Sequence, residues 1–193
     1  MKKTFTVLIL LGVFCIPSVL AGPFGIDMGM SLAQVKAVSK TEPVHVQDDV
    51  YEITPPKTND MFETYYVRID PEYGVYWLKA IGKDVNTNNY GHELISVFNS
   101  LAESIEKTYG NYEKIDRREV GLGNIPDFFM KALEDGARTL GALWQKEYGS
   151  TLPDEIETIA ITVEALSEDL GYVALEYSFS NTAKVKAKAD SVF

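Results

Sequence analysis

Cysteine is almost absent from this chain: its 193 residues include one, Cys15, which lies in an apolar stretch at the N-terminus. A lipoprotein signal places small residues before its cysteine, whereas bulky Phe14 precedes Cys15. We expect this stretch to be removed. The remaining chain would then have no disulfide, no thiolate nucleophile and no cysteine metal site.

Long hydrophobic runs are absent after the first residues. Lys2 and Lys3 precede an apolar run over residues 5–16, and Val19 and Ala21 form a small-residue V-x-A pattern. This order predicts a signal peptide, residues 1–21, cleaved after Ala21. The apolar run is short for a membrane span, although an uncleaved anchor is the alternative. We therefore expect a periplasmic or secreted protein with no stable membrane insertion after signal cleavage.

Basic residues are in the minority, with 18 Lys and Arg against 28 Asp and Glu and a formal net charge of −10. Loss of Lys2 and Lys3, with no acidic residue, would take this charge from −10 to −12. Such a chain should repel nucleic acid and anionic lipid. The charge suits either simple solubility or a basic protein partner.

Enzyme signatures are also scarce. The segment HELIS, residues 92–96, has Ser96 where a zinc protease has its second histidine, and GLGN, residues 121–124, is an isolated G-x-G. Neither a P-loop nor a G-x-S-x-G elbow occurs. We therefore predict a chain that is not an enzyme and needs no cofactor.

A calcium loop is only partly matched. Asp84, Asn86 and Asn88 have the alternate spacing of EF-hand ligands, but Asn89 replaces the glycine and Ile95 the bidentate glutamate. A polar turn before a helix explains the same residues, so we predict no metal here and leave a weak calcium site as the alternative.

Neighbouring acids leave one catalytic alternative open. Asp154, Glu155 and Glu157 lie close together before an apolar segment. A glycosidase needs two carboxylates that face each other across a cleft, which sequence spacing cannot establish. An exported carboxylate-dependent hydrolase therefore remains the second hypothesis, and a small-ligand-binding periplasmic protein is the third.

The hydrophobic pattern predicts an α+β fold, with helices packed on one face of an antiparallel sheet. Helical spacing favours helices over residues 31–39, 91–109 and 125–135, with Ile125 and Phe128 on the buried stripe of the last one. Alternation predicts strands over residues 157–165 and 172–180. Aromatic and β-branched residues favour a hairpin of two strands over 62–69 and 75–81, and further strands are expected over 139–147 and, as one or two short strands, over 41–54. A helix followed by strands thus occurs twice. We expect one domain over residues 22–181, with possible halves 22–85 and 86–181, and a flexible tail over 182–193.

Aromatic residues gather in the first predicted hairpin and supply the candidate protein-binding residues Tyr65, Tyr73, Tyr76 and Trp77. Successive strand residues point to opposite faces, so Tyr65 and Tyr66 should separate, as should Tyr76 and Trp77. One aromatic row must face outward or be covered by another element. Exposed aromatics are common at protein interfaces.

The segment GMSLAQV, residues 29–35, predicts a helix start. Ser31 and Gln34 have capping-box spacing, and Met30 and Val35 have the spacing of a hydrophobic staple. The segment resembles the G-M-[ST]-x-x-[QE]-V motif of small exported bacterial α+β domains, including the SmpA/BamE outer-membrane assembly lipoproteins and the beta-lactamase inhibitor protein. It lacks their lipobox cysteine and the glycine-x-proline that often follows the helix. The resemblance implies two helices on a short antiparallel sheet and non-catalytic binding of another protein, as an inhibitor, immunity factor or envelope-assembly accessory.

Overall fold

A computed structural model describes residues 22–191, so the predicted leader lies outside the described residues. The structure is an α+β fold built on one nine-stranded antiparallel sheet, as the sequence predicts. Among the described residues, no helix is both long and apolar enough to cross a membrane. The elements in chain order are η1 (Pro23–Gly25), α1 (Leu32–Val38), β1 (Val44–Gln47), β2 (Val50–Ile53), β3 (Phe62–Asp70), β4 (Gly74–Gly82), β5 (Val85–Asn86), α2 (His92–Tyr109), β6 (Glu113–Arg118), η2 (Leu122–Asn124), η3 (Pro126–Phe128), α3 (Phe129–Glu134), β7 (Arg138–Trp144), η4 (Lys146–Tyr148), β8 (Ile156–Ala165), β9 (Leu170–Phe179) and α4 (Thr182–Asp190).

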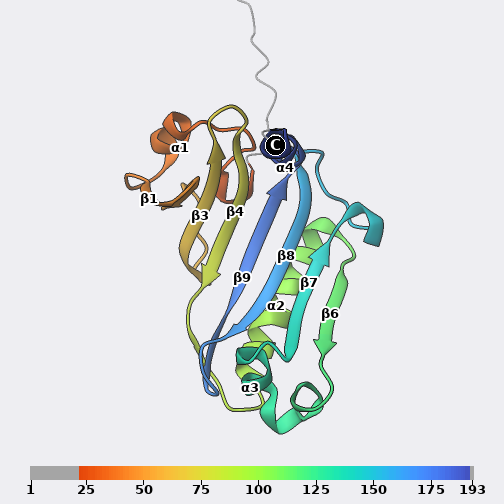
Figure 1. Cartoon of the computed structure of the whole chain (residues 1–193). Coiled ribbons are helices and arrows are strands. Elements are labelled where there is room, and N and C mark those ends of the chain that lie inside the picture. Colours follow the sequence, from red (N-terminus) through yellow and green to blue (C-terminus); the bar gives the residue numbers. More distant parts are fainter. Residues whose placement is uncertain (1–21, 192–193) are drawn as a thin grey trace, which may run out of the picture.

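The strand order is β1-β2-β3-β4-β9-β8-β7-β6, with β5 paired to one end of β9. Each half of the chain therefore contributes a helix followed by antiparallel strands, and the last strand of each half, β4 or β9, meets the other at the centre. Leu78 lies opposite Tyr177, and Ala80 lies opposite Leu175. The two halves form one continuous sheet, which Figure 1 shows face-on with α2 behind β7 and β8.

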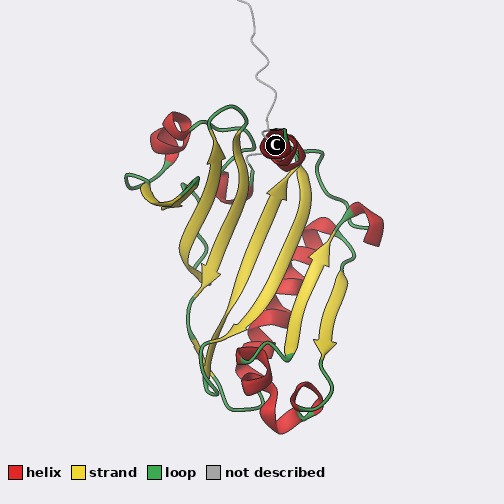
Figure 2. Ribbon diagram, in the orientation of Figure 1, coloured by secondary structure: helices red, strands yellow, loops and turns green. Residues whose placement is uncertain are grey.

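The core lies between the sheet and the helices on one side of it (Figure 2). α2 buries its apolar stripe, which comprises Leu94, Phe98, Leu101, Ala102 and Ile105. β8 and β9 bury alternate residues, as their sequence pattern predicts: Ile159, Ile161 and Val163 on β8, and Val173, Leu175, Tyr177 and Phe179 on β9. Burial of one side chain in two is what a sheet with a single covered face requires.

The start of α1 is confirmed as a capping box. The Ser31 N–H donates to Gln34 Oε1 over 2.8 Å, and the Gln34 N–H donates to Ser31 Oγ over 3.4 Å. Val35 is buried in the core, and Met30 packs against the same apolar cluster. The residues that predicted a helix start therefore do start a helix, and they fix it to the sheet.

The structure differs from the sequence analysis at three places. Ile125 and Phe128 are 43% and 47% exposed, because η3 precedes α3 and turns this end of the predicted stripe away from the core. β6 forms in a segment that the hydrophobic pattern left unassigned. Residues 182–190, expected as part of a flexible tail, form helix α4, which Figure 1 shows end-on beside the end of β4.

Candidate functional site on the open face of the sheet

The sheet has one face that α2 and α3 cover and one that they do not. Cross-strand register assigns side chains to the uncovered side, which we call the open face. Its members include Glu52 on β2, Tyr66 and Arg68 on β3, Trp77, Lys79 and Ile81 on β4, Tyr172, Ala174, Glu176 and Ser178 on β9, Thr158, Ala160, Thr162 and Glu164 on β8, Gly141 and Leu143 on β7, and Glu113, Ile115 and Arg117 on β6. Most are half-buried or exposed, and Figure 1 looks onto this face.

Trp77 is the best-anchored side chain of the open face. Its indole Nε1–H donates to Glu176 Oε2 over 3.2 Å, across the seam between the two halves. The other Glu176 oxygen accepts from Lys79 Nζ at 2.7 Å, and the Arg68 guanidinium lies 5.5 Å from the Trp77 ring centroid. A large half-exposed aromatic side chain is therefore held in place by two strands. Such pre-ordering lowers the entropic cost of binding.

Tyr76 departs from the expected alternation. A β-bulge shifts the register between Arg68 and Ile69, so that both Tyr76 and Trp77 approach Arg68. The Tyr76 hydroxyl donates to a carboxylate oxygen of Asp49. Burial, with Asp49 as a second cause, raises the pKa of Tyr76 to about 12, so the phenol stays protonated and keeps donating.

The four candidate aromatic residues therefore occupy different places. Tyr65 is 3% exposed and lies in the core, where its hydroxyl accepts from the Asn59 N–H over 3.0 Å. Tyr73 lies at the tip of the β3–β4 hairpin under Lys188 of α4, whose Nζ is 5.6 Å from the ring centroid. Tyr76 is buried against Asp49, and only Trp77 presents a half-exposed ring on the open face.

Sequence reasoning overlooked Tyr66 and Tyr172 as candidates, although both are half-buried on the open face. Alternation along β3 does separate Tyr66 from Tyr65, so the signal for Tyr66 was available. Ile115 was overlooked for a different reason, since it lies on β6, which the sequence pattern did not reveal.

The charges of the open face are unequal. Three carboxylates of this face are exposed and form no ion pair among the described residues, those of Glu52, Glu113 and Glu164. Among the described residues of the face, Arg117 is the one cation that is likewise exposed and unpaired. Lys79 and Arg68 are already matched by Glu176 and Asp49. The open face therefore has an excess of unmatched carboxylates.

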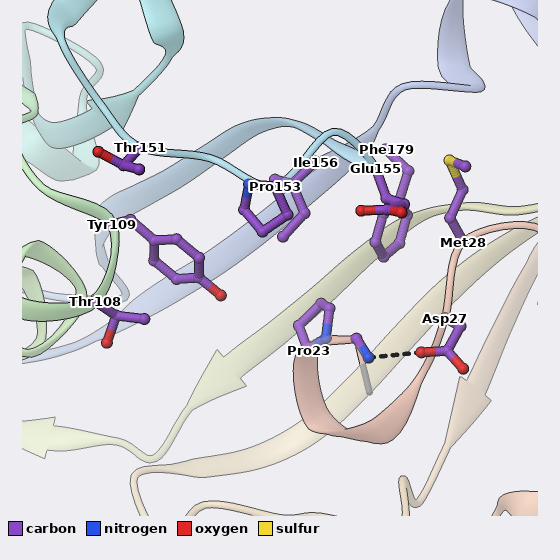
Figure 3. Close-up of a pocket in the computed structure, with 11 residues that line it drawn as sticks. Pro23, Asp27, Met28, Thr108, Tyr109, Thr151, Pro153, Glu155, Ile156 and Phe179 are labelled. Carbon is purple, nitrogen blue, oxygen red and sulfur yellow. Dashed lines mark hydrogen bonds between the residues drawn. The ribbon is translucent and has the colours of Figure 1, made fainter. Parts of the chain in front are cut away.

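A second feature lies on the helix side of the sheet. A pocket of about 750 Å³ is bounded by η1, the end of α2 and the loop before β8 (Figure 3). Its lining is mainly apolar, with Pro23, Ile156 and Phe179 among its residues, and the Tyr109 hydroxyl points into it. Burial raises the pKa of Tyr109, so its phenol also remains a neutral donor.

The acidic residues of the hydrolase hypothesis are not gathered around this pocket. Glu155 lines it, but Asp154 is 98% exposed and pairs with Lys146 at 3.0 Å. Glu157 is exposed on β8. Within residues 22–191, no group of three or more His, Cys, Asp and Glu side chains could hold a metal ion. Asp84 lies directly before β5, and Asn86 pairs with Leu170 of β9.

No protein-family model, curated protein or solved structure matches the chain.

Proposed function

We propose that the chain is an exported, non-catalytic protein that binds another protein through the open face of its sheet. The observation that carries this proposal is the ordered cluster of Tyr66, Arg68 and Trp77 on a face without a covering helix. Tryptophan, tyrosine and arginine are the residue types that contribute most to protein interfaces. The leader, the scarcity of enzyme signatures and the resemblance of residues 29–35 support the same function.

The partner that fits this surface is a folded protein with a basic patch. Three unmatched carboxylates are spread across the open face: Glu52 lies opposite Tyr66, Glu164 lies opposite Tyr172, and Glu113 lies on the edge strand β6. A net charge of −10, or −12 without the leader, adds a long-range attraction for a basic partner. Electrostatic complementarity of this kind accelerates association and makes it sensitive to salt.

Site-specific crosslinking in the cell tests which surface meets the partner. A photo-crosslinking amino acid at Tyr66 should trap a protein that the same amino acid at Tyr90 does not. Tyr90 is the matched control, because it is an exposed aromatic residue just before α2 and lies off the open face. Equal trapping from both positions would refute the assignment of the surface.

Affinity measurements with the trapped partner then test the chemistry. Trp77→Ala should weaken binding at least about tenfold, the loss typical of a central aromatic anchor, whereas Tyr90→Ala should leave it unchanged. Glu164→Lys should slow association, with a larger effect at low salt. Unchanged affinity in Trp77→Ala would contradict the proposal.

The pocket supports a second candidate function, the binding of a small, mainly apolar molecule. Its volume of about 750 Å³ lies in the usual range for ligand sites, and Tyr109 offers a hydrogen-bond donor within it. Native mass spectrometry of the exported protein should then detect a bound molecule of a few hundred daltons. Thr108→Trp, which places an indole in the pocket wall, should remove it.

A further inference from the structure

The residues that follow the predicted cleavage point fold back onto the pocket. The backbone N–H of Gly22 donates to Asp27 Oδ1 over 2.6 Å, and both residues line the pocket (Figure 3). η1 lies between them, closed by the Gly25 N–H, which donates to the Gly22 carbonyl over 2.9 Å. The first described nitrogen of the chain is thus held by a carboxylate five residues further on.

The position of Gly22 has no room for a side chain. A Cβ atom there would lie 2.1 Å from the carbonyl oxygen of Ile26 and 3.1 Å from Asp27 Oδ1. Ile26 belongs to the core and is fully buried, so its backbone cannot move aside freely. Only glycine therefore fits where the nitrogen meets Asp27.

The turn also connects the two halves of the sheet. Phe24 adopts a left-handed backbone conformation, with φ of 57°, and inserts its ring between aromatic side chains. Its centroid lies 5.0 Å from that of Tyr65 on β3 and 6.3 Å from that of Tyr177 on β9. A non-glycine residue keeps this conformation only where the surrounding structure enforces it. The position of Phe24 thus depends on how residues 22–27 are held.

We propose that cleavage of the Ala21–Gly22 bond turns the Gly22 nitrogen into an ammonium group that pairs with Asp27 and fixes Phe24 between the two halves. The inference rests on the export that the proposed function includes. A leader peptidase uses water to hydrolyse the bond. Ala21 takes the hydroxyl as part of a carboxylate, and the nitrogen of Gly22 takes up protons and gains one positive charge.

The charges around the pocket favour the ammonium group. Glu155, on the loop before β8, lines the same pocket, and none of the described lining residues is a lysine or an arginine. The uncut chain offers Asp27 only a neutral amide donor. The carboxylate already makes this hydrogen bond a strong one, and the ammonium group adds a full positive charge, so cleavage would add a Coulombic attraction to the contact. The leader would then control both export and the final closure of this turn.

The reactivity of the terminal amine tests this proposal without any partner. The exported protein is first weighed intact, to establish that it begins at Gly22. It is then treated with limiting acetylating reagent near neutral pH, and acetylation of Gly22 is compared with that of the exposed Lys83 by peptide mass spectrometry. The Gly22 amine should react at least about tenfold more slowly in the native protein than in Asp27→Asn.

Two further variants keep the result unambiguous. Asp154→Asn removes one carboxylate from the same loop as Glu155 and should leave the Gly22 rate unchanged. Asp27→Glu retains the charge and should keep part of the protection even if Asp27→Asn folds poorly. The proposal would be overturned if the Gly22 amine of the folded native protein reacted as fast as the Gly22 amine of Asp27→Glu unfolded in urea. It would also be overturned if the exported chain began at another residue. Loss of partner binding would not affect this outcome, so the two proposals can fail separately.

Discussion

Asp116 offers the sharpest test of how the edge of the sheet is held. It lies on β6, the outermost strand, where Arg138 Nε and Nη2 donate to its two carboxylate oxygens, each over 2.9 Å. Arg118 also donates to Oδ2, and the Arg138 guanidinium stacks 4.6 Å from the Phe129 ring centroid of α3. One carboxylate therefore links the edge strand to β7 and, through Arg138, to a helix.

The magnitude follows from the titration of this carboxyl. Hydrogen bonds from Arg118 and Arg138 lower the pKa of Asp116 from 3.8 to about 2, although burial acts in the opposite direction. A shift of this size corresponds to about 1 to 2 kcal/mol of stability once screening by solvent is allowed for. Because the folded pKa is depressed, this stability is present above about pH 4 and is lost as the pH falls toward 2. Roughly half should remain at pH 3.

The perturbation is Asp116→Asn, measured by urea and thermal unfolding between pH 3 and pH 7. At pH 7 the variant should lose about 1 to 2 kcal/mol, or about 3 to 6 °C in melting temperature for a chain of this length. The loss should shrink toward pH 3, since the native carboxylate begins to protonate there. Asp154→Asn, at an exposed pair, should change stability little at either pH.

A loss that is equal at pH 3 and pH 7 would refute this reasoning, because it would assign the effect to packing instead of charge. An unchanged stability at pH 7 would refute it as well. The Arg138 side chain is 13% exposed, so removing its counter-charge leaves a largely buried cation without its main partner. An Asp116→Asn variant with unchanged stability would therefore contradict this geometry.

Four further substitutions test the fold and the open face. Gly74→Ala should cost at least about 2 kcal/mol in denaturation experiments, because Gly74 has a φ of +68° and a Cβ there would lie 2.1 Å from the Gly29 carbonyl oxygen. Ser31→Ala removes the N-cap of α1 and should cost about 1 kcal/mol, measured in the same way. The chain has two tryptophans, so Trp144→Phe leaves only Trp77, and Trp77→Phe leaves only Trp144, which is fully buried. Emission of that variant should be quenched severalfold more readily by acrylamide than emission of Trp77→Phe, and equal quenching would contradict the open face.

Sequence patterns predicted the parts of the fold in which one side chain in two is buried. β8 alternates cleanly because Ile159, Ile161 and Val163 face the helices while their neighbours face outward. The helical stripe of α2 was equally readable, since Phe98 and Leu101 recur at the spacing of one turn. In both cases the residue's own segment holds all the information that the prediction needs.

Edge strand β6 could not be predicted in this way, because its inward residues are charged. Lys114 lies over the Phe98 ring at 5.6 Å, and Asp116 binds Arg138, so neither position shows the apolar alternation of a strand. Charged edge strands are common because they prevent pairing with other chains. Their inward charges are satisfied only by residues distant in sequence, which the local pattern does not contain.

The candidate site was predictable only in part, for a similar reason. The aromatic hairpin was visible, and Tyr66 on the outward row follows from alternation. The bulge that lets both Tyr76 and Trp77 approach Arg68 depends on the register between β3 and β4. The hydrogen bond from Trp77 to Glu176 joins residues that are 99 positions apart in the sequence. The resemblance carried by residues 29–35 remains a prediction.

The two proposed features share the central seam of the sheet from opposite sides. On β9, Tyr177 faces the ring of Phe24, while the preceding residue, Glu176, faces outward and holds Trp77. On β3, Tyr65 and Tyr66 divide in the same way between the N-terminal turn and the open face. Because successive strand residues point to opposite faces, a turn that fixes these strands from the helix side also fixes the spacing of the aromatic cluster. If both proposals hold, removal of the leader would also set the spacing of the surface that we propose binds a partner.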